Sequence, residues 1–240
     1  MSLLASFFPL SISRVSTSQE ITMPESHNDL IDNPSPRCPV ALVLDTSGSM
    51  CGAPIDELNA GIQFFIDEVK RDDLARWSVD LAVYTAGGSA DCIQDFIGVE
   101  QIAGVAPLGA SGSTPLGAAT HMALNDLEGR KRAYRGAGVP YYQPWLVLIS
   151  DGGPTDSWQE VARRASDLSA RRKLVSLPIG VNGADLGTLS CFSTKPAVAL
   201  DGLKFRELFQ WLSASMARVS ASTSSDASVQ LPSNESWGSI

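Results

Sequence analysis

The sequence has few of the residues that bind zinc or carry out nucleophilic catalysis. Only two histidines are present, and the four cysteines form no C-x-x-C pair, which argues against a Cys/His zinc site. There is neither a G-x-x-x-x-G-K-[ST] phosphate loop nor a G-x-S-x-G nucleophile elbow. Scattered cysteines in a chain of 240 residues need no disulfide framework, so the reducing cytoplasm is the expected location.

An excess of positive charge and long apolar runs are also absent. Against 26 acidic residues stand 18 Lys and Arg, and a net charge of −8 argues against nucleic acid as the main partner. No apolar run approaches the ~18 residues that a membrane helix requires, so no membrane association is expected. Residues 3–10 faintly resemble the apolar part of a signal peptide but lack a preceding basic residue. Whether Met1 or Met23 is the natural start stays open.

The residues that are present alternate between strand and helix patterns around one core. Hydrophobic residues make up 44% of the chain, and the expected strands cover 40–45, 79–84, 93–99, 145–149, 174–179 and 197–200. Helices are expected after Pro54, from Thr114 to the basic cluster at 130–132, after a Ser157/Glu160 capping box, and over 205–219. This alternation predicts an α/β fold with a doubly wound, mostly parallel sheet, one antiparallel edge strand, and helices on both faces.

The ends of the chain differ in composition from this alternating region. Residues 1–36 predict a flexible lead-in, and residues 220–240 predict a disordered, Ser-rich tail. The single domain expected between them covers residues 37–219.

Oxygen-bearing side chains follow the two most apolar strands. Asp45, Ser47 and Ser49 come directly after the run 40–44, and Asp151 ends the run 145–149. Thr114 follows a glycine-rich loop and begins a helix. Each of these residues could serve only as a turn or cap residue, but strands beside a topological switch point bring their C-terminal loops to one crevice. Two carboxylates and three hydroxyls there would suit Mg²⁺ or Mn²⁺.

These motifs resemble those of the von Willebrand factor A (VWA) domain with its metal-ion-dependent adhesion site. The matching residues are Asp45-Thr46-Ser47-Gly48-Ser49, Thr114, and Ser150-Asp151-Gly152, within residues 37–219. The resemblance implies a VWA fold in which Ser47, Ser49 and Thr114 bind the ion directly, while Asp45 and Asp151 hold its water ligands.

A finer resemblance rests on Arg37-Cys38-Pro39 and on the segment 113–117, which are similar to the bacterial tellurium-resistance TerY-type branch. That branch implies a cytoplasmic, single-domain protein. It also implies a tellurite or stress-response gene cluster that includes a kinase and a protein phosphatase.

The function that these observations predict is metal-dependent binding of a protein, without catalysis. The ion would keep one coordination position open for an Asp or Glu of the partner. One alternative is a Mg²⁺-dependent phosphohydrolase with Asp45 as nucleophile. Haloacid-dehalogenase-type enzymes carry a second Asp two residues further on, where this chain has Ser47. Another alternative is a secreted VWA adhesin with a cleaved signal and paired cysteines.

Overall fold

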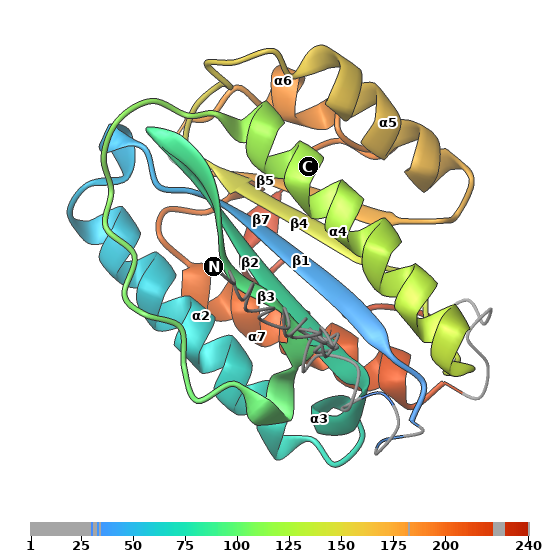
Figure 1. Cartoon of the computed structure of the whole chain (residues 1–240). Coiled ribbons are helices and arrows are strands. Elements are labelled where there is room, and N and C mark those ends of the chain that lie inside the picture. Colours follow the sequence, from blue (N-terminus) through green and yellow to red (C-terminus); the bar gives the residue numbers. More distant parts are fainter. Residues whose placement is uncertain (1–29, 31–32, 34, 182, 223–228, 240) are drawn as a thin grey trace, which may run out of the picture.

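The computed structural model describes residues 30, 33, 35–181, 183–222 and 229–239. These residues form a seven-stranded sheet in the order β3-β2-β1-β4-β5-β6-β7 (Figure 1). All neighbours pair in parallel except β3 with β2 and β7 with β6. The strands are β1 (Cys38–Asp45), β2 (Val79–Gly87), β3 (Ser89–Gly98), β4 (Trp145–Ser150), β5 (Val175–Gly180), β6 (Val198–Leu200) and β7 (Gly238–Ser239). The predicted fold class is confirmed, and the short β7 adds a second antiparallel edge.

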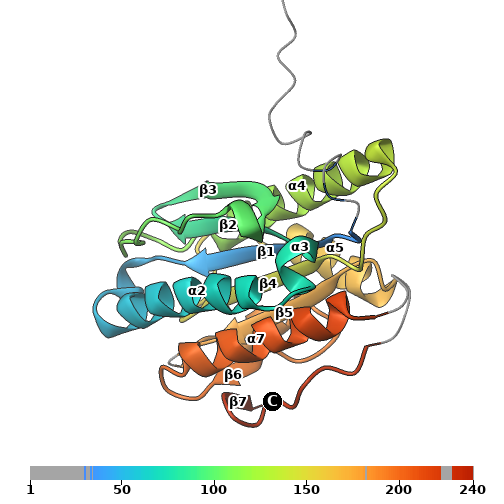
Figure 2. The same cartoon turned by 90° about the horizontal axis from the view of Figure 1, so that it is seen from below.

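Helices cover both faces of the sheet, with α2 and α7 on one side and α4, α5 and α6 on the other (Figures 1 and 2). The helices are α2 (Ala53–Arg71), α3 (Ala75–Ser78), α4 (Leu116–Ala137), α5 (Gln159–Ala170), α6 (Leu186–Ser190) and α7 (Phe205–Ser220). Two 3-10 turns, η2 (Gly48–Met50) and η3 (Val99–Gln101), complete the described elements.

Strand β1 is apolar throughout because both of its faces are buried. Val40, Leu42 and Leu44 point into the core shared with α2 and α7. Ala41 and Val43 point into the core shared with α4 and α5. Because side chains alternate across a strand, a central parallel strand needs an unbroken apolar run, which the sequence provides.

Two predicted details of the helices are wrong. Helix α4 does not end in the basic cluster but continues for more than a turn, to Ala137, where Gly138 takes a left-handed conformation. Arg130 of this cluster therefore lies inside the helix, where it is buried and forms an ion pair with Asp80 of β2. The capping box before α5 is also not formed, since that helix begins after Trp158 without a side-chain cap.

The prediction of a disordered tail is wrong for residues 229–239. Trp237 is fully buried, and its ring lies 5.3 Å from the ring of Trp211 on α7. The Trp211 indole N–H donates to the carbonyl of Pro232 at 2.9 Å, and β7 pairs with β6. Aromatic burial therefore holds this segment against the domain. Residues 223–228 and most of the predicted lead-in lie outside the described residues.

All four cysteines are free thiols, and Cys38 is the buried one. In the part of the chain that the structure describes, no helix combines the length and hydrophobicity needed to cross a membrane.

Candidate metal centre

The proposed site lies where β1 and β4 end, which is the topological switch point of the sheet. Asp45 is the last residue of β1 and is fully buried. Its Oδ1 accepts the backbone N–H of Ser47 at 2.9 Å, and its Oδ2 accepts the hydroxyl of Ser150 at 2.5 Å. These bonds fix the turn after β1 and hold the carboxylate against the end of β4.

Three side-chain oxygens then form a row toward solvent. Ser47 Oγ lies 3.1 Å from Ser49 Oγ, and the Ser49 hydroxyl donates to Asp151 Oδ1 at 2.8 Å. Ser47 is buried and Ser49 is exposed, so the row opens outward. Adjacent oxygens of an octahedral Mg²⁺ shell, with bonds of 2.0–2.1 Å, are about 3 Å apart. The Ser47–Ser49 separation therefore matches neighbouring positions in such a shell, and Asp151 lies within hydrogen-bond distance of one of these ligands.

Backbone hydrogen bonds bring the glycine-rich loop to the same place. Gly48 N–H donates to Gly112 O at 3.0 Å, and Ser111 N–H donates to Thr46 O at 2.8 Å. Gly112 has a φ of +73°, and a Cβ there would lie 2.6 Å from the Cα of Gly88. Only glycine permits this close approach, so the loop composition has a structural reason.

Thr114 follows this loop and is buried, with 6% of its surface exposed. Its backbone N–H donates to Thr155 Oγ1 at 3.1 Å, and its carbonyl accepts the Thr155 N–H at 2.9 Å. Within the described residues, its hydroxyl makes no hydrogen bond, which leaves that oxygen available as a ligand. The structure thus joins Asp45, Ser47, Ser49 and Asp151 through side chains, and Thr114 through the backbone.

Three further residues support the site, and two of them, Thr155 and Asp156, were missed from the sequence. Ser150 orients Asp45, Thr155 holds Thr114, and the carboxylate of Asp156 accepts the N–H groups of Gly117 and Ala118 at 3.0 and 2.7 Å. Asp156 thereby caps α4 from a different loop. Ser150 was matched as part of the Ser150-Asp151-Gly152 motif without a role of its own, whereas the other two depend on contacts between distant loops.

Burial affects the acidity of the outer carboxylate. Desolvation raises the pKa of Asp151, the hydrogen bond from Ser49 opposes that shift, and the negative charge of Asp45 adds to it. A divalent cation would relieve both the desolvation and the repulsion. The candidate site has two carboxylates and three hydroxyls. It therefore does not form a cluster of three or more His, Cys, Asp or Glu side chains, and no such cluster occurs among the described residues.

Solved structures share this architecture. The VWA2 paralog of ArnB from Sulfolobus acidocaldarius aligns with 75% of this chain and 45% of its own, at 15% identity and a TM-score of 0.51. A von Willebrand factor type A protein from Catenulispora acidiphila aligns with 76% of this chain and 43% of its own, at 13% identity and a TM-score of 0.53. This chain has the VWA fold.

A third VWA-like structure is proximal thread matrix protein 1 from the mussel byssus. It aligns with 77% of this chain and 49% of its own length, at 15% identity and a TM-score of 0.54. Another structure of that protein is described as having a zinc-occupied MIDAS motif. This chain spans less than half the length of these three proteins, and such identities establish the fold alone. No family model and no curated protein matches the sequence.

Proposed function

We propose that this chain is a metal-dependent binding module that holds Mg²⁺ or Mn²⁺ and recognises an Asp or Glu of a protein partner. The observation that carries the proposal is the row of Ser47, Ser49 and Asp151 oxygens, with separations of 3.1 and 2.8 Å, above the buried carboxylate of Asp45. Oxygen-only donors favour a hard cation over zinc.

The donor set also explains why the ion would attract a partner. Ser47, Ser49 and Thr114 would bind the metal directly, and all three are neutral. Asp45 and Asp151 would act through water, so much of the ion's charge would remain in its direct shell. A bound divalent cation is often the largest local charge in a site, and an external carboxylate would complete its coordination. The exposed Ser49 lies on the side from which a partner could approach.

The environment of Asp45 supports binding without turnover. A nucleophilic carboxylate must reach its substrate, whereas Asp45 is fully buried and both of its oxygens accept hydrogen bonds. Ser47 occupies the position at which haloacid-dehalogenase-type enzymes carry their acid/base. We therefore favour a binding role over a phosphohydrolase.

The biological setting that we propose rests on sequence resemblance alone. Similarity to the TerY-type branch favours a cytoplasmic protein in a tellurite or stress-response system, with a kinase or phosphatase as partner. Co-purification of such an enzyme with the wild-type chain, but not with the Thr114→Ala variant, would support this setting.

Titration calorimetry with Mg²⁺ and Mn²⁺ tests the metal site directly. We expect one site per chain, lost in Asp45→Ala and weakened in Ser49→Ala. Ser236→Ala, which changes an exposed serine in the turn before β7, should bind as the wild type does. Tight, stoichiometric Zn²⁺ binding that survives Asp45→Ala would refute the assignment.

A further inference from the structure

A large cavity lies at the N-terminal ends of the central strands, opposite the strand ends that carry the metal centre. Its volume is about 1080 Å³, and its lining includes Trp145 and Val175, the first residues of β4 and β5. The candidate metal centre lies beyond the last residues of β1 and β4. A ligand in this cavity would therefore contact a surface separate from the metal.

The lining of this cavity is strongly basic in a chain that is acidic as a whole. One carboxylate, Glu128, faces six cationic side chains: Lys131, Arg135, Arg164, Arg172, Lys173 and Lys195. The whole chain has 18 Lys and Arg and a net charge of −8, so a third of its cations line this one cavity. The concentration of charge opposes the overall balance and points to an anionic ligand.

Five of these six cations have no acidic partner among the described residues. Lys131 pairs with Glu128 at 2.6 Å, Arg135 donates to the Tyr141 hydroxyl, and Arg164 donates to Asn125 Oδ1. Arg172, Lys173 and Lys195 are exposed and form no ion pair within the part of the chain that the structure describes. Helices α4 and α5 both have their C-termini near this cavity, but each C-terminus contributes only roughly −0.5 charge. The potential therefore remains positive.

Arg172 places one of these cations at a backbone position that favours glycine. Lys173 N–H donates to Leu168 O at 2.8 Å and Arg172 N–H donates to Ser169 O at 3.0 Å, the two bonds of a Schellman motif ending α5. Arg172 has a φ of 53° and is the one non-glycine residue with positive φ among those described. Helix α4 ends with Gly138 in the same left-handed conformation, which costs a non-glycine residue roughly 1–2 kcal/mol.

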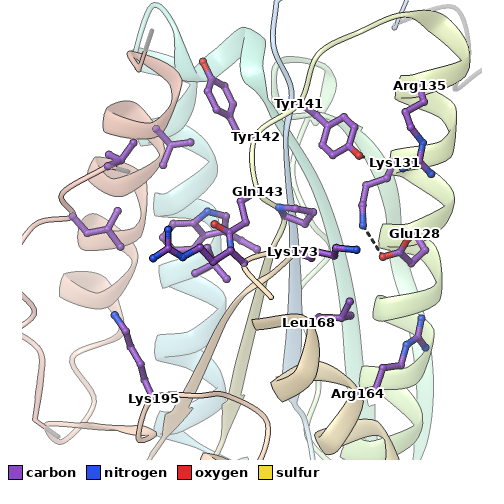
Figure 3. A pocket seen from close by; sticks show the side chains of 17 residues that line it. Glu128, Lys131, Arg135, Tyr141, Tyr142, Gln143, Arg164, Leu168, Lys173 and Lys195 are labelled. Atoms are coloured by element: carbon purple, nitrogen blue, oxygen red, sulfur yellow. Dashed lines mark hydrogen bonds and ion pairs between the residues drawn. The ribbon is translucent and has the colours of Figure 1, made fainter. Parts of the chain in front are cut away.

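We propose that this cavity binds an acidic polypeptide segment of a partner. The cations come from α4, α5, the α5–β5 turn and the α6–β6 loop, and Figure 3 shows Lys131 and Arg135 on one side, Lys195 on the other, and Lys173 between them. Charges spread in this way suit an extended chain of carboxylates better than one compact anion. The concave surface does not fit a flat membrane, and the acidic remainder of the protein would repel a long nucleic acid.

The test is fluorescence anisotropy with a labelled oligoglutamate peptide, an oligoglutamine peptide of equal length, and a single-stranded oligonucleotide. We expect the glutamate peptide alone to bind, more weakly as salt rises, and equally well with chelator present. Lys173→Gln and Lys195→Gln should each weaken binding about two- to fivefold, as expected for one exposed charge pair. Arg132→Gln, an exposed change on α4 outside the lining, is the matched control.

Arg172→Gly separates binding from folding. Glycine is favoured at this left-handed position, so the variant should be at least as stable as the wild type while binding the peptide more weakly. Peptide binding that is unaffected by all three cavity variants would overturn the proposal. Loss of binding on chelation would assign the peptide to the metal centre instead. Tighter binding of the oligonucleotide through the same residues would also overturn it, in favour of a nucleic-acid site.

Discussion

At the residue scale, one buried carboxylate connects three elements of the domain. Asp80 of β2 pairs with Arg37 Nη1 at 3.0 Å and with Arg130 Nη2 at 2.6 Å, and it accepts the Tyr134 hydroxyl at 2.5 Å. All four side chains are buried. The cluster joins β2 to the segment before β1 and to α4. It lies at the N-terminal ends of these strands, opposite the metal centre.

Asp80→Asn should lower the free energy of unfolding by about 3–5 kcal/mol, because two buried arginines would lose their counter-charge. Urea unfolding followed by circular dichroism measures the change. Glu68→Gln, which removes the partner of the exposed Arg71, should stay within about 0.5 kcal/mol of the wild type. A loss below about 1 kcal/mol in Asp80→Asn would mean that the cluster is solvated in solution.

At the element scale, the C-terminal segment acts as part of the domain. Trp237 packs on Trp211, whose ring lies 6.4 Å from that of Trp145 at the start of β4. The Asp201 N–H also donates to the carbonyl of Trp237 at 2.9 Å. The segment thus closes the edge of the sheet beside β6, which would otherwise present unpaired backbone groups.

Trp237→Ala should destabilise the protein by about 3–5 kcal/mol, the usual cost of removing a fully buried aromatic side chain. Within the described residues the Trp237 indole N–H has no hydrogen-bond partner, so Trp237→Phe removes an unsatisfied donor and should cost less. Chemical denaturation of both variants gives the comparison. Glu235→Ala, an exposed change two residues away, provides the baseline. Equal stability of Trp237→Ala and wild type would show that the segment is undocked in solution.

At the scale of the whole molecule, two buried tyrosines make stability sensitive to alkaline pH. Burial and the adjacent Asp126 raise the pKa of Tyr84 above its usual value of 10.0, and burial and Asp80 raise the pKa of Tyr134. Above pH 10 the unfolded chain loses these protons while the folded chain retains them. The folded state then binds more protons, so the free energy of unfolding falls as pH rises.

We expect each of these tyrosines to contribute up to about 1.4 kcal/mol per pH unit to this decrease above pH 10. Urea unfolding on both sides of pH 10 measures the slope, and Tyr84→Phe should reduce it. A slope that is the same in Tyr84→Phe and wild type would mean that Tyr84 ionises equally in the folded and unfolded states.

The sequence by itself determined the fold class and the location of the candidate site. Unbroken apolar runs such as Val40–Leu44 are typical of strands buried on both faces in the centre of a parallel sheet, and the polar residues that end β1 and β4 lie at the switch point. Asp45, Ser47 and Ser49 were predictable because they are local to one strand end, and Asp151 because it ends the other apolar run.

Only the tertiary structure decided which polar residues act together across the chain. Arg130 belongs to a basic cluster that was predicted to end a helix, yet it is buried within α4 and paired with Asp80, 50 residues away. Trp237 lies in a Ser-rich segment whose composition predicts disorder, but its burial against Trp211 and the pairing of β7 with β6 hold the segment on the domain. The basic cavity combines cations from four separate elements. Local patterns report which face of an element is buried, whereas long-range charge pairing and docking depend on neighbours that only the folded chain brings together.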